Sequence, residues 1–68
     1  MEMIRVNSSN IHSVGYFENL LIVKFLNNTV YEHYNVPERL FTGLIRSSSK
    51  GTYYSSNIKN KFKTKRIR

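Results

Sequence analysis

Apolar and polar residues alternate along the first half of the chain in a way that predicts a β-meander. Residues 11–16 alternate with a period of two, and residues 20–26 form an apolar run rich in β-branched and aromatic side chains. Residues 30–34 return after Asn27-Asn28, and asparagine tolerates the positive φ that tight hairpins need. With residues 3–6 as a short extended stretch, we expect an antiparallel meander of three or four strands.

After residue 34 the pattern changes to the spacing of an amphipathic helix. Asn35 is the predicted N-cap, and Pro37 suits the first turn, where its missing N–H costs nothing. We expect this helix over residues 37–47, with Gly43 permitting close approach to the sheet and Gly51 in a left-handed conformation after its end. Its apolar stripe packs on one face of the sheet and consists of Leu40, Phe41, Leu44 and Ile45.

The remaining residues carry weaker structural signals. Tyr53-Tyr54 is predicted to be extended, with one ring buried and the other exposed, and residues 55–62 to hold a short helical turn built on Ile58 and Phe62. Residues 63–68 are predicted to be a flexible basic tail. The expected fold is therefore one α+β domain over residues 1–62, with a single helix on a meander and a basic tail.

Charge is distributed unevenly along this pattern. The net charge is +7, and residues 1–46 contain four basic and four acidic side chains. The last 22 residues contain no acid, and an end of one sign predicts an anionic partner, most often nucleic acid. We expect phosphate contacts from its basic residues, with Tyr53 or Tyr54 stacking on a base. These basic residues are Lys50, Lys59, Lys61, Lys63, Lys65, Arg66 and Arg68.

Other chemistry finds little support in the sequence. There is no cysteine, and the two histidines are far apart, so neither a disulfide nor a metal site is expected. Ser8, Ser9 and His12 are interpreted as turn-forming serines and a surface histidine rather than a catalytic set. His33 is predicted to replace an aromatic residue on the sheet. We expect no enzyme activity and no cofactor, and the lack of a signal peptide or membrane-length apolar run predicts a cytoplasmic protein.

Several short motifs, taken in order, resemble the KTSC domain. They are Ser8-Ser9-Asn10-Ile11, Val14-Gly15-Tyr16, Val30-Tyr31, Val36-Pro37, Ser49-Lys50-Gly51-Thr52-Tyr53-Tyr54 and Ile58. The resemblance covers roughly residues 3–62. The family is named for its occurrence at the C-terminus of some lysyl-tRNA synthetases, and it also forms small standalone proteins of bacteria and phages. This chain departs from the usual pattern at Phe17, His33, Ser47 and Ser55.

The resemblance implies no catalytic activity that can be transferred to this chain. Attachment to a tRNA-charging enzyme implies RNA contact, although a shared fold does not fix a function. Our first hypothesis is therefore a nucleic-acid-binding module, with RNA favoured. The second is a protein-interaction module, for example a phage-encoded modulator of a host protein, whose basic end meets an acidic protein surface. If the sheet face opposite the helix displays aromatic residues, it would serve as a homodimer interface or a nucleic-acid platform.

Overall fold

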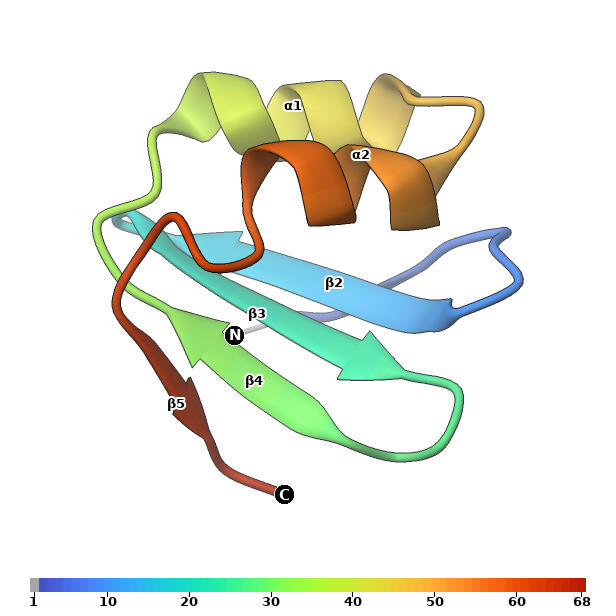
Figure 1. Cartoon of the computed structure of the whole chain (residues 1–68), viewed down its shortest axis with the longest axis horizontal. Coiled ribbons are helices and arrows are strands. Elements are labelled where there is room, and N and C mark those ends of the chain that lie inside the picture. The colour runs from blue at the N-terminus through green and yellow to red at the C-terminus, as the bar shows by residue number, and fades with distance from the viewer. Residues whose placement is uncertain (1) are drawn as a thin grey trace.

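Figure 1 shows a five-stranded antiparallel sheet with two helices on one of its faces, in a computed structural model that describes residues 2–68. The strands lie in the sheet in the order of the sequence. They are β1 (Ile4–Arg5), β2 (Ile11–Phe17), β3 (Leu20–Phe25), β4 (Val30–His33) and β5 (Thr64–Arg66). Helices α1 (Glu38–Arg46) and α2 (Lys50–Asn57) connect β4 to β5. The α+β class and the antiparallel meander are thus confirmed.

The predictions of three or four strands and of a single helix were wrong. The structure places residues 64–66, expected to lie in a flexible tail, in β5, where Tyr31, Glu32 and His33 of β4 face Arg66, Lys65 and Thr64. All three β5 side chains are exposed, so no apolar alternation marks the strand in the sequence. Its position depends on backbone hydrogen bonds to β4, a long-range pairing that local pattern does not encode.

The second helix occupies residues expected to be a helix end and an extended pair. Gly51 lies inside α2 rather than after a helix, and Tyr53 and Tyr54 are helical. Tyr54 and Ile58 are four residues apart and both are buried, which is the spacing of one helical face. A Cβ at Gly51 would lie 3.1 Å from Nδ2 of Asn10, so this glycine lets the β1–β2 turn approach α2 closely.

Helix α1 begins and packs differently in detail from the prediction. Its N-cap is Pro37, without a side-chain cap hydrogen bond, and Asn35 instead occupies a left-handed turn with φ 60°. Gly43 makes room for the ring of Tyr53 in α2 rather than for the sheet, because a Cβ there would overlap the Tyr53 hydroxyl. Leu44, from the predicted stripe, is fully buried.

The hydrophobic core lies between the sheet and the helices. Leu21 and Val23 of β3 and Val14 of β2 are completely buried on this face, together with Leu44 and Ile58 from the helical side. The register of the β2–β3 pairing shifts between residues 11 and 13 because β2 contains a bulge there. The bulge lets both ends of β2 face the core.

Turns in this small sheet use residues with positive φ. Glu18 and Asn19 connect β2 to β3 with φ values of 47° and 68°, as a type I′ hairpin turn requires. Asn28, in the next turn, has φ 72°, the positive φ expected of the Asn27-Asn28 pair. The connection itself comprises residues 26–29 and is longer than the two-residue turn predicted from that pair. No helix within the described residues is long and apolar enough to cross a membrane.

Candidate functional site

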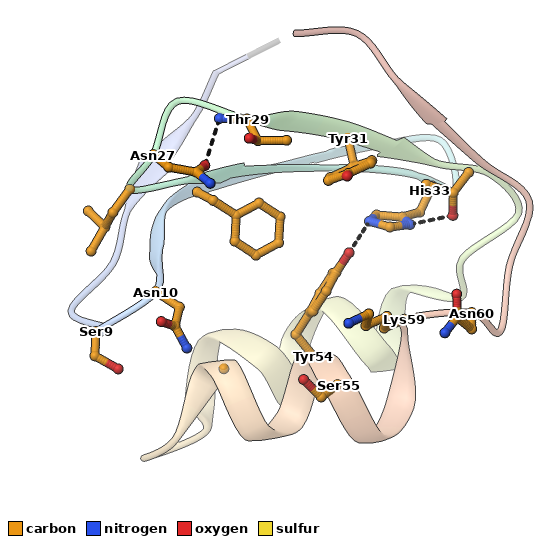
Figure 2. A pocket seen from close by; sticks show the side chains of 14 residues that line it. Ser9, Asn10, Asn27, Thr29, Tyr31, His33, Tyr54, Ser55, Lys59 and Asn60 are labelled. Atoms are coloured by element: carbon orange, nitrogen blue, oxygen red, sulfur yellow. Dashed lines mark hydrogen bonds between the residues drawn. The ribbon is translucent and has the colours of Figure 1, made fainter.

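A cleft of about 610 Å³ opens between α2 and the adjoining ends of β3 and β4. Figure 2 shows its lining, with Tyr54 extending from the helix toward His33 and Tyr31 on the strand. Asn10 lies at one side of the cleft and Lys59 and Asn60 at the other. On the helical side, α1 packs on β2 through Phe41 and Tyr16, and Tyr54 of α2 contacts Phe25 of β3 and His33 of β4.

Aromatic rings form much of the wall. Phe25 contacts Tyr31 and Tyr54 at ring-centroid distances of 6.0 and 5.3 Å, with interplanar angles of 82° and 78°. Tyr31 also stacks on His33 at 6.3 Å. Strand alternation explains the grouping, since residues two apart on β4 share a face, and that face is the one toward the helices. These rings contact one another in a single cluster at the cleft.

A directional chain of hydrogen bonds runs along one side of the cleft. The hydroxyl of Thr64 donates to the carbonyl of Phe62 at 3.0 Å, so its oxygen accepts from Nδ1–H of His33 at 2.8 Å. Nε2 of His33 is then an acceptor, and the hydroxyl of Tyr54 donates to it at 3.0 Å. This assigns His33 as a neutral ring protonated at Nδ1, and it confirms that the residue packs as an aromatic substitute, 1% exposed.

Burial shifts the pKa values of the two titratable side chains in this series of hydrogen bonds, His33 and Tyr54. Desolvation lowers the pKa of His33, because the imidazolium form would lose water without gaining a charged partner. Burial, together with the charge of Tyr31, raises the pKa of Tyr54 to about 12. Both groups therefore stay neutral near pH 7. Their arrangement stabilises a fixed wall and leaves neither group poised for proton transfer near pH 7.

The basic residues predicted to bind phosphate fall into two groups. Lys59, Lys61 and Lys63 lie in and beside the α2–β5 connection, and Lys65, Arg66 and Arg68 lie on β5 or follow it. All six side chains are exposed. Arg66 lies opposite Tyr31 in the sheet and so on the cleft side, whereas Lys65 lies opposite Glu32 on the other face. Nε of Arg66 donates to the carbonyl of Arg68 at 3.0 Å.

Lys50 belongs elsewhere in the fold. Its ammonium donates to the carbonyl of Ser47, at the C-terminal end of α1, at 2.7 Å. There it complements the negative end of that helix. Lys50 lines a second, polar hollow of about 290 Å³ with Ser8, Ser9 and Thr52, away from the aromatic rings.

The two tyrosines singled out from the sequence differ in environment. Tyr54 is 7% exposed and belongs to the core, with its hydroxyl at the cleft. Tyr53 is half-buried against Gly43 of α1. The half-buried Phe25 and Tyr31 line the cleft together with Tyr54, whereas Tyr53 does not. Alternation along residues 30–34 was the signal that Tyr31 and His33 share a face.

Ser8 forms hydrogen bonds within the early turn, as predicted for a turn-forming serine. The hydroxyl oxygen of Ser8 accepts from the backbone N–H groups of Asn10 and Ile11 at 3.2 and 3.1 Å. His12 lies on the bulge, with Nδ1 3.0 Å from the hydroxyl of Ser13. Over residues 2–68 no group of three or more His, Cys, Asp or Glu side chains is arranged to hold a metal ion.

The face of the sheet opposite the helices carries mixed side chains. Leu20 and Ile22 of β3 lie there with Lys24, and Glu32 of β4 accepts a hydrogen bond from the hydroxyl of Tyr34 at 2.6 Å. Most ring-bearing residues of the sheet face the helices instead. An aromatic platform on this face, the condition attached both to a homodimer interface and to a nucleic-acid platform there, is therefore not what the strands present.

Comparison with known proteins finds a family and a solved structure that this chain resembles. Residues 7–62 match the family model described as the KTSC domain. The crystal structure of a KTSC domain protein from Yersinia pestis superimposes with a TM-score of 0.93 at 33% sequence identity, covering 98% of this chain and 97% of that one. No curated protein matches the chain.

Proposed function

This chain belongs to the KTSC domain family, and on that premise we propose that it is a non-catalytic module that binds single-stranded nucleic acid. The observation that supports the proposal is the exposure of six basic side chains between residues 59 and 68, on the loop and strand that bound an aromatic cleft. Basic grooves next to aromatic rings are the usual means of binding single strands without strict sequence preference.

Electrostatics favours a polyanion at this edge. No carboxylate lines the cleft: Glu2 precedes β1, Glu18 is in the β2–β3 turn and Glu38 begins α1. Glu32 lies directly across the sheet from Lys65, on the face opposite the cleft. The basic residues of the C-terminal segment are therefore not interleaved with acids in the sequence or along β5. Displacing counterions from about five phosphates would give a log–log salt slope near −3.5 for a single strand, by the usual factor of about 0.7 per contact.

A charge-matched pair of variants tests the proposal. The first combines Lys59→Gln, Lys61→Gln and Lys63→Gln, and the control combines Arg5→Gln, Arg39→Gln and Arg46→Gln, all exposed residues. Each triple variant lowers the net charge from +7 to +4. If the C-terminal residues contact phosphate, the first should reduce the salt slope for a short oligoribonucleotide by about 2, while the control keeps most of the slope. Equal slopes, or no binding at low salt, would refute the proposal.

Substitution is preferable to truncation in this test. Because β5 pairs with β4 and carries Thr64, a chain ending at Ile58 would lose a strand and the acceptor for Nδ1 of His33. Loss of binding on truncation would then report unfolding as well as lost charge. RNA is the favoured polymer, and strands of RNA and DNA with the same base sequence compare the two directly.

The same basic edge also suits an acidic protein surface, since β5 is an edge strand with one unpaired side. Lysine and arginine on an edge strand additionally hinder pairing between copies of the sheet. A polyglutamate competitor separates these cases, because it carries regular negative charge without bases. Stronger displacement by polyglutamate than by polyuridylate of equal charge would favour the acidic protein surface.

A further inference from the structure

The cleft beside α2 has the size and lining of a small-ligand site. Its volume of about 610 Å³ falls within the usual range for such sites, roughly 300–1,000 Å³. Its 14 lining residues include Lys59 and no carboxylate. Aromatic and polar groups share the lining, and Figure 2 shows the amide side chains of Asn10 and Asn60 at opposite sides of the opening.

The aromatic contacts favour a planar guest. Phe25 meets both Tyr31 and Tyr54 nearly at right angles, so its two described aromatic contacts are T-shaped rather than parallel stacks. Tyr31 is half-buried and uses one stacking contact, on His33. A flat aromatic ligand is the class of molecule that adds parallel stacking to rings arranged in this way.

Polar groups around the rings suit the edge of a base. Asn10, Asn27 and Asn60 carry amides that offer both donors and acceptors, and Thr29 and Ser55 add hydroxyls. Unpaired bases are recognised by this combination of ring stacking and hydrogen bonding along their edges. Lys59 at the opening, and Arg66 across from Tyr31 on the same face, provide positive charge where a phosphate attached to that base would lie.

We propose that this cleft holds one unpaired base of a nucleic acid strand, with the ring of Phe25 stacked on the base, the nearly perpendicular ring of Tyr31 meeting the base at its edge, and Lys59 at the flanking phosphate. This inference rests on the proposed nucleic-acid-binding function and adds to it a site for the base itself. The basic edge then supplies affinity without base preference, and the cleft supplies the part of the affinity that depends on a base being present.

Two neighbouring serines of α2 provide a matched test. Ser55 and Ser56 are both exposed, but only Ser55 lines the cleft. Ser55→Trp fills the cleft with a bulky ring, and Ser56→Trp places the same ring on the helix outside it. Each variant and the parent chain are titrated with a short oligoribonucleotide and with the same strand lacking its bases, at two salt concentrations.

The parent chain and the Ser56→Trp variant should bind the normal strand about 5- to 150-fold more tightly than the abasic strand, the range measured for stacking of one base. Ser55→Trp should remove most of that ratio and leave the salt slope unchanged. If both strands bind the parent equally, or if Ser55→Trp preserves the ratio, the base site is refuted while the phosphate-binding function stands. Absence of binding to either strand at low salt would instead refute the function itself.

Proton NMR of the two histidines gives an independent readout in the native chain. His33 lines the cleft, whereas His12 lies on the β2 bulge outside it. Titration with uridine or adenosine monophosphate should shift the ring signals of His33 and leave those of His12 nearly unchanged, while inorganic phosphate should not reproduce the His33 shift. Equal shifts of both histidines, or an equal effect of phosphate alone, would contradict a base site.

Discussion

The hydroxyl of Tyr54 lies 3.0 Å from Nε2 of His33, and this hydrogen bond joins α2 to β4 across 21 residues of sequence. On its other side His33 donates to Thr64 of β5 at 2.8 Å. One neutral imidazole therefore connects three elements that meet only in the folded chain. Among residues 2–68 no buried side-chain nitrogen or oxygen lacks a hydrogen-bond partner, so this polar chain is fully satisfied.

Removing the Tyr54 hydroxyl should destabilise the fold. Tyr54→Phe leaves the buried Nε2 of His33 without its donor, and we expect the free energy of unfolding to fall by about 1–3 kcal/mol. Tyr53→Phe is the matched control, because the Tyr53 ring packs on Gly43 and the change should alter stability by less than about 0.5 kcal/mol. Urea unfolding of both variants measures the difference. Equal losses would mean that the hydrogen bond to His33 contributes nothing specific.

Acidification should weaken the fold through His33. Burial lowers the pKa of His33 in the folded state below its ordinary value of 6.5, so the unfolded chain takes up the proton first. The contribution of His33 to the free energy of unfolding is complete above about pH 6.5, and it declines as pH falls from there toward the lower pKa of the folded state. Urea unfolding between about pH 8 and pH 5 measures this slope.

His33→Gln should remove most of the acid dependence, because glutamine does not titrate. His12→Gln should remove less of it. The pKa of His12 is also lowered, by desolvation and by the charges of Arg5 and Lys24, but its ring lies outside the core. A larger effect of the His12 substitution would contradict this assignment. NMR titration of the two rings provides the individual pKa values.

Alkaline conditions should weaken the fold through Tyr54. Its pKa is about 12 in the folded chain, above the ordinary value of 10, so the unfolded chain releases its proton first. The contribution of Tyr54 to the free energy of unfolding is complete below about pH 10 and is lost as pH rises through about 12. We expect Tyr54→Phe to flatten this decline even though it lowers stability at neutral pH. In an ultraviolet titration of the native chain, a tyrosine that ionises near pH 12 should disappear in the same variant.

The β2–β3 turn offers a stabilising substitution. Glu18 has φ 47°, in the left-handed region where asparagine is tolerated better than glutamate. Glu18→Asn should therefore raise the free energy of unfolding by about 0.5–1 kcal/mol. Glu18→Gln is the control, because it removes the same charge without the asparagine preference, and it should give little or no gain. Thermal unfolding compares the two, and equal gains would assign the effect to charge.

Much of this fold follows from local pattern. Alternation in residues 11–16 and 30–34, the apolar run after residue 20 and the stripe ending at Ile45 place four of the elements, because each must turn one apolar face toward a core. Those constraints act within a few residues. The concentration of positive charge in the last third of the chain and the lack of cysteine are likewise evident from the sequence.

The tertiary structure alone decided which residues meet. Strand β5 has no apolar alternation and exists through backbone hydrogen bonds to β4, a partner some 30 residues earlier in the chain. That pairing brings Thr64 to His33 and the basic edge to Tyr31, and α2 completes the cleft with Tyr54. A cleft is a property of elements packed across the sheet, so neither composition nor periodicity can reveal it before the chain is folded.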